Sequence, residues 1–140
     1  PPGWGGAAKH THYGHNSSTD VTVIPEQAKN PILTGVKGPF HARSWLYRVL
    51  PDYPTKGSTW LLMGKSVNPD KEAIENPVAW TGTNSSGGKV FMTTRGHPED
   101  FRLEPCQRLG SNAIHDELGL KVPKEWKGKM DIQVPYREAK

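Results

Sequence analysis

The sequence predicts a fold of the α/β class, and three observations lead to this prediction. Five short segments have the apolar, β-branched or aromatic composition of strands. Another segment has the apolar periodicity and the end signals of a helix. Two of the strand candidates are joined by a turn rich in Gly, Asn and Ser, which is typical of a hairpin. The expected strands span residues 20–24, 43–50, 59–63, 77–81 and 89–94, and the expected helix spans residues 105–118.

The composition indicates a folded chain with long loops. Hydrophobic residues make up 34% of the 140 residues, which is low for a sheet covered by helices on both faces. The 5 Trp, 4 Tyr and 3 Phe nevertheless provide side chains that can form a core. We expect one domain at most, or part of one.

The charge, the apolar runs and the cysteine content argue against a nucleic-acid partner, a membrane segment and an intrachain disulfide. The net charge of +4 permits nucleic-acid binding, but no helix-turn-helix, RNP or zinc-finger spacing is present, so we predict no nucleic-acid partner. No run approaches the roughly 18 apolar residues that span a bilayer, so no membrane segment is expected. The single Cys excludes an intrachain disulfide.

The first three expected strands are separated by loops. Pro25 ends the strand at residues 20–24, and a loop follows to residue 39. In residues 43–50 the side chains alternate, which would place Trp45, Tyr47 and Val49 on one face of a strand. Pro and Gly residues then precede the strand at residues 59–63.

A hairpin at residues 77–94 organises the rest of the chain. Its second strand ends in the polar run Arg95-Gly96-His97-Pro98-Glu99-Asp100. A strand can deliver such residues to a cleft at the edge of a sheet. We therefore expect His97 in a cleft, with Arg95, Glu99 and Asp100 at its rim.

The expected helix has clear ends. Pro105 suits the first helical turn, and Gly119 suits the position after the last one. Its apolar stripe consists of Cys106, Leu109, Ala113 and Leu118. We expect this stripe to pack against the hairpin strands, and we expect residues 124–140 to form an extended basic tail.

The hairpin also resembles the ThuA-like (trehalose-utilisation) family, through PVAWT, a Gly-rich turn, KVFMTT and then GH. NPILTGV at residues 30–36 is similar to that family's HPI-x-x-G segment, and residues 106–120 look like its closing helix. The resemblance covers most of residues 19–123. It implies a three-layer α/β sandwich of the class I glutamine amidotransferase-like (flavodoxin-like) type, of which this chain is the C-terminal part without the N-terminal strand–helix half. Residues 1–18 would form a His-rich loop region.

The same resemblance implies a function in bacterial carbohydrate catabolism, in the cytoplasm or the periplasm. The protein would act on or bind a disaccharide or a keto-sugar derivative, possible activities being those of a sugar isomerase or hydrolase. The apolar residues of the expected strands would need cover on one face of the sheet. The expected partner is therefore the N-terminal half of the same domain or a second copy in a homo-oligomer.

His97 and Glu99 are the candidate catalytic residues. HPE has the form of the His-x-Glu pair of class I glutamine amidotransferases, in which the His activates a Cys and the Glu orients the His. No Cys precedes His97, and Cys106 lies in the apolar stripe, so a Cys-triad glutaminase is not predicted. His97 could act as a general acid or base. The alternative is that His97 merely caps the turn before the helix.

Ligand-binding candidates complete the set. His12 and then His15 are expected to line the same cleft as His97, and Thr94 and Trp80 could hold a sugar, although a Trp in PVAWT is more often part of a core. His10, His12 and His15 could also form a weak zinc or copper site, but no Cys or carboxylate stands nearby, so no tightly bound metal is predicted. No cofactor motif is present. A non-catalytic carbohydrate- or partner-binding module and a His-loop metalloprotein remain the alternative functions.

Overall fold

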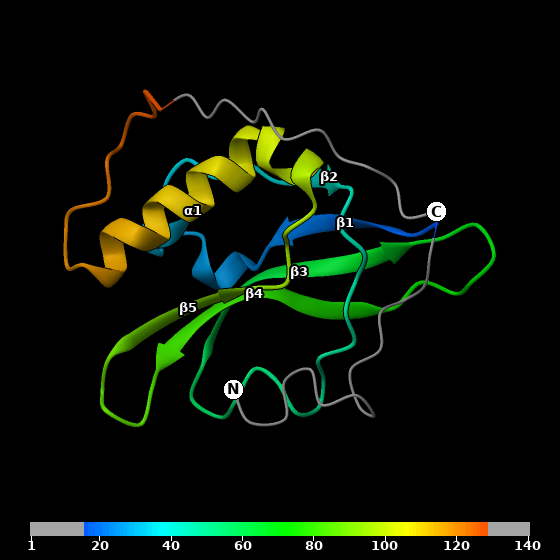
Figure 1. Ribbon diagram of the computed structural model, residues 1–140, viewed down its shortest axis with the longest axis horizontal. Coiled ribbons are helices and arrows are strands. Elements are labelled where there is room, and N and C mark those ends of the chain that lie inside the picture. The colour runs from blue at the N-terminus through cyan, green and yellow to red at the C-terminus, as the bar shows by residue number, and fades with distance from the viewer. Residues whose placement is uncertain (1–15, 129–140) are drawn as a thin grey trace.

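A computed structural model describes residues 16–128, which form a curled antiparallel sheet with one α-helix over it (Figure 1). The strand order in the sheet is β2-β1-β3-β4-β5. The strands are β1 (Ser18–Val23), β2 (Phe40–Ala42), β3 (Thr59–Val67), β4 (Glu75–Thr83) and β5 (Lys89–Thr93). The helices are the 3-10 helices η1 (Pro25–Gln27), η2 (Pro31–Leu33) and η3 (Pro98–Arg102) and the α-helix α1 (Glu104–Glu117).

The prediction of a three-layer α/β sandwich is wrong. Each of the four strand pairs is antiparallel, and the described residues form a mainly β structure with a helix at the C-terminal side. Antiparallel neighbours can be joined by turns, whereas parallel neighbours need a crossover of a dozen or more residues. Antiparallel connections of this kind account for the single α-helix among the described residues.

The predicted hairpin is confirmed as β4 and β5. Trp80 pairs with Met92, and Thr81 pairs with Phe91. The side chain of Asn84 stabilises the turn, because its Oδ1 accepts the backbone N–H groups of Ser86 at 2.9 Å and Gly88 at 2.8 Å. Such Asn turns give the backbone a local partner where the strand ladder stops.

The predicted strand at residues 43–50 is wrong, and β2 instead occupies the three residues between it and the loop that we expected to end at residue 39. Residues 43–58, here named the covering segment, run across the sheet (Figure 1) and contain no strand, only a single bridge residue at Tyr47. Side chains bind the backbone donors of this segment in place of a neighbouring strand. Oδ1 of Asn76 accepts the N–H groups of Val49 at 3.0 Å and Leu50 at 3.1 Å. The predicted alternation fails as well, since Val49 is buried while Tyr47 is 40% exposed.

Helix α1 confirms most of the predicted helix. Gly119 has a φ of +68°, and the N–H of Leu120 bonds to the carbonyl of His115 at 2.8 Å, as expected of a glycine after the last turn. Leu109 and Ala113 belong to the hydrophobic core, as predicted. Leu118 does not, because it is 68% exposed.

The sheet is covered on both faces near β4 and β5. In β5, Val90 and Met92 face one way, and Lys89 and Phe91 face the other, because side chains alternate along a strand. Helix α1 covers the Lys89 face, where the ammonium of Lys89 lies 3.1 Å from Oδ2 of Asp116. The covering segment closes the opposite face. There Gly64 allows the side chain of Leu46 in the covering segment to approach the sheet closely, because a Cβ at Gly64 would lie 3.0 Å from Cδ1 of Leu46.

Candidate functional site

A buried carboxylate, Asp100, joins the covering segment to the chain after β5. Asp100 is 1% exposed. Its Oδ1 accepts the backbone N–H groups of Arg43 at 2.7 Å and Ser44 at 3.2 Å. Its Oδ2 accepts the hydroxyl of Ser44 and Nη2 of Arg95, the latter at 3.2 Å. Both oxygens are therefore engaged by groups of the protein itself.

The hydroxyl of Ser44 is engaged in the same way. It accepts the backbone N–H groups of Gly96 at 3.1 Å and His97 at 3.0 Å while donating to Asp100. Ser44, Arg95 and Asp100, here named the polar cluster, thus hold the loop after β5 against the start of the covering segment. The hydroxyl of Ser44 thus donates to Asp100 and accepts two backbone N–H groups, so its hydrogen-bonding capacity is used within the protein.

The charges of the polar cluster are shielded from solvent. The side chain of Arg95 is 5% exposed, and burial lowers the pKa of its guanidinium while Asp100 raises it. Burial raises the pKa of the neighbouring Cys106 thiol to about 11, and Arg95 partly opposes this rise. A thiol with such a pKa stays protonated near neutral pH and is a poor nucleophile. The prediction that Arg95 and Asp100 stand at the rim of a cleft is wrong, because both are buried.

His97 caps the short helix η3. Its Nδ1 accepts the backbone N–H of Glu99 at 3.1 Å, which is the capping alternative considered from the sequence. Because Nδ1 accepts, a neutral imidazole carries its proton on Nε2. Glu99 is exposed, and its Oε1 lies 3.3 Å from Nη1 of Arg102. The half-buried Thr94 donates its backbone N–H to the carbonyl of Val78 at 3.1 Å.

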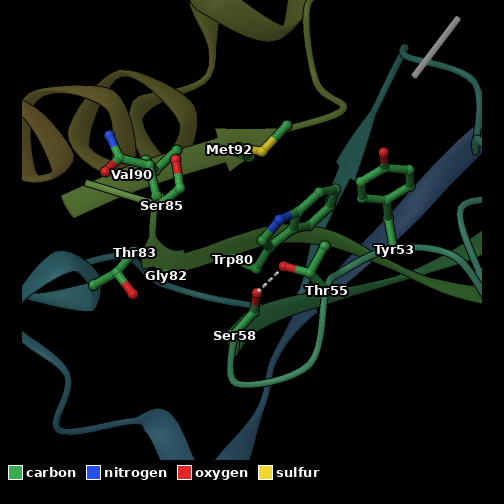
Figure 2. A pocket seen from close by; sticks show the side chains of 10 residues that line it. Tyr53, Thr55, Ser58, Trp80, Gly82, Thr83, Ser85, Val90 and Met92 are labelled. Carbon is green, nitrogen blue, oxygen red and sulfur yellow. Dashed lines mark hydrogen bonds between the residues drawn. The ribbon is translucent and has the colours of Figure 1, made fainter. Parts of the chain in front are cut away.

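A cavity of about 390 Å³ opens on the other face of the hairpin (Figure 2). Its walls come from the end of the covering segment, from β4 and β5, and from the turn between them. We name it the aromatic cavity, after Trp80 and Tyr53. Its lining residues are Tyr53, Thr55, Ser58, Trp80, Gly82, Thr83, Asn84, Ser85, Val90 and Met92.

The aromatic cavity has an apolar base and a polar rim. Trp80 is 3% exposed and forms the base, whereas Tyr53, Val90 and Met92 are half-buried. The hydroxyls of Thr55 and Ser58 lie 3.3 Å apart on the covering segment, which Figure 2 shows beside the indole of Trp80. The volume lies in the range of pockets that hold small molecules, about 300–1,000 Å³.

The structure places the predicted site residues in two separate regions. Trp80 lines the aromatic cavity, but Thr94, His97 and Glu99 are not among the lining residues. The predictions for His10, His12 and His15 lie outside the described residues. Sequence reasoning missed Ser44 as a partner of Asp100, because 56 residues separate the two and neither has a local motif. It also missed Tyr53, which stands between prolines in a segment without periodicity.

No helix in residues 16–128 is long and apolar enough to cross a membrane. Within the same residues, no group of three or more His, Cys, Asp or Glu side chains is placed to hold a metal ion.

Comparison with known proteins finds no matching family model, no matching curated protein and no matching solved structure. The ThuA-like resemblance therefore remains a prediction from the sequence motifs.

Proposed function

We propose that this protein binds a small carbohydrate in the aromatic cavity. The ThuA-like resemblance implies a disaccharide or a keto-sugar derivative as the ligand. The observation that carries the proposal is the pairing of an aromatic, apolar base with a rim of hydroxyl and amide groups. A sugar ring has the same two-sided character, with C–H groups on its faces and hydroxyls around its edge.

Each part of the cavity has a role in this proposal. Trp80 and Met92 shape the apolar base, and the half-buried ring of Tyr53 provides a flat surface on which a sugar ring can rest. The hydroxyls of Thr55 and Ser58 both donate and accept hydrogen bonds, as sugar hydroxyls do. Apolar lining with a few placed polar groups is typical of small-molecule sites.

Binding without catalysis is the version that the geometry favours. In the polar cluster, both oxygens of Asp100 and the hydroxyl of Ser44 are bonded within the protein, and the thiol of Cys106 is held protonated. Nδ1 of His97 is engaged in capping, and His97 does not line the aromatic cavity. We therefore propose a carbohydrate-binding module, with proton transfer by His97 as the competing hypothesis.

Backbone amide NMR with titrated sugars tests this proposal on the full chain. Trehalose, maltose and fructose are added to the ¹⁵N-labelled protein, with glycerol as a small polyol control. We expect shifts at the amides of Gly82, Ser85 and Val90 with at least one sugar, and a loss of affinity of about tenfold in Tyr53→Ala. The matched control is His97→Asn, which keeps a capping acceptor and lies outside the cavity. Sugar-induced shifts confined to His97 and its neighbours would reject the cavity and support the competing hypothesis.

A further inference from the structure

We propose that the aromatic cavity selects uncharged sugars and rejects sugar phosphates and sugar acids. This inference rests on the proposed function and adds the chemical class of the ligand. Among residues 16–128, none of the ten that line the cavity is Lys, Arg, His, Asp or Glu. A ligand phosphate or carboxylate in this cavity would therefore lose its water without gaining an opposite charge, which is costly.

The positive charges closest in sequence do not line the cavity. Lys89 precedes Val90, but its ammonium lies 3.1 Å from Asp116 on the face that α1 covers. Lys56 follows Thr55 and is exposed in the covering segment. Of these two cations, Lys56 is therefore the one that a ligand phosphate could recruit, and the experiment has to test it.

The polar groups of the rim suit a ligand that both donates and accepts. Hydroxyl side chains at Thr55, Ser58, Thr83 and Ser85 can take either role. Oδ1 of Asn84 already accepts two backbone N–H groups, so its Nδ2 is the part that can serve a ligand, as a donor. Neutral sugar hydroxyls match this mixture, whereas anions are bound most strongly by charged donors such as Arg and Lys.

Gly82 provides a way to narrow the cavity by one methyl group. A Cβ at this position would lie 3.2 Å from Oγ of Ser58, across the cavity wall. The Gly82→Ala substitution therefore places a methyl group beside Ser58 and leaves less room for a ligand. The matched control is Gly110→Ala in α1, because a Cβ at Gly110 meets no atom within 4 Å.

The test measures affinities for matched sugars by calorimetry, with amide NMR to locate the site. Trehalose is compared with trehalose 6-phosphate, and glucose with glucose 6-phosphate and glucuronate, against the wild type, Gly82→Ala, Gly110→Ala and Lys56→Gln. We expect the neutral member of each set to bind at least tenfold more tightly, Gly82→Ala to weaken it at least tenfold, and Gly110→Ala and Lys56→Gln to leave it unchanged.

The outcomes separate this inference from the proposed function. If a phosphate or a uronate binds in the cavity as tightly as its neutral counterpart, carbohydrate binding stands and the selectivity is rejected. If Lys56→Gln then lost this binding of the phosphate or uronate, Lys56 would be the cation that binds the anion. If no sugar, charged or neutral, shifts the cavity amides, the proposed function and the selectivity are both rejected.

Discussion

The polar cluster lies beyond the end of β5, and the aromatic cavity lies along β5 itself. The covering segment borders both regions. Ser44 at the start of this segment bonds to Asp100, and Tyr53 near its end lines the cavity. In the polar cluster, buried charges are bonded to one another and to backbone N–H groups. In the aromatic cavity, uncharged groups surround open space.

The residues richest in chemistry therefore need not form the site. Buried charges require partners, and in the polar cluster the oxygens of Asp100 and the hydroxyl of Ser44 hold loops together. The aromatic cavity has fewer reactive groups but has room for a ligand. Four experiments test this distinction between the two regions.

The largest effect is expected from Asp100→Ala. Removing the carboxylate leaves the buried guanidinium of Arg95 without its partner and two backbone N–H groups without an acceptor. Breaking a buried ion pair costs about 3–5 kcal/mol. We expect a loss of stability of this size in urea denaturation. The control Glu99→Gln, at an exposed neighbour, should stay within about 0.5 kcal/mol. A folded, equally stable Asp100→Ala that no longer binds sugar would move the site into the polar cluster.

A smaller loss is expected from Ser44→Ala. The substitution removes a buried hydroxyl that accepts the N–H groups of Gly96 and His97. Leaving buried donors unsatisfied costs roughly 1–3 kcal/mol. Urea denaturation measures the loss, with Ser86→Ala in the exposed turn as the matched control. If the two variants were equally stable, the bonds of Ser44 would not hold the covering segment in place.

Cys106 should weaken the fold at alkaline pH. Its folded pKa of about 11 lies above the ordinary value of 9.0, so its contribution to stability is complete below about pH 9. As the pH rises from 9 towards 11, the thiol ionises in the unfolded chain but stays protonated in the folded one, and this contribution is lost. We expect the free energy of unfolding to fall more steeply with pH in the wild type than in Cys106→Ala. Equal slopes would show that Cys106 is not held in its protonated form.

The smallest effect concerns His97. His97→Ala removes the side-chain acceptor for the N–H of Glu99 and should cost about 0.5–1 kcal/mol, as for other lost caps. His97→Asn keeps an acceptor at the same position and should recover most of this stability. Thermal melting compares the variants, and sugar titrations on the same samples should give unchanged affinities. Turnover of a keto-sugar that His97→Asn abolishes without loss of stability would instead make His97 a proton donor or acceptor.

Local signals in the sequence were sufficient for the hairpin and the helix. Residues 77–81 and 89–94 carry apolar strand patterns on either side of Gly and Asn, and these features act over a few residues. The same holds for Gly119, whose positive φ ends α1 where the sequence indicated. Trp80 was a candidate ligand contact from the sequence, and it lines the cavity.

Long-range contacts decided the rest. The alternation in residues 43–50 predicted a strand, but Asn76 and Asp100, which lie 26 to 57 residues away in sequence, bind the backbone donors of this segment. The ThuA-like resemblance gave a parallel, layered architecture, whereas the direction of strand pairing emerges only when the strands meet.

The hairpin and the helix ends could be predicted from the sequence, because each depends on side chains a few positions apart. Which candidate residues are buried and bonded, and which line the aromatic cavity, depends on the three-dimensional fold. Burial and hydrogen-bond partners depend on segments brought together from across the chain. Ser44 and Tyr53 both belong to the covering segment, yet Ser44 bonds to Asp100 in the polar cluster and Tyr53 lines the aromatic cavity. For this reason the polar run after β5 became a structural cluster, and the cavity formed beside Trp80.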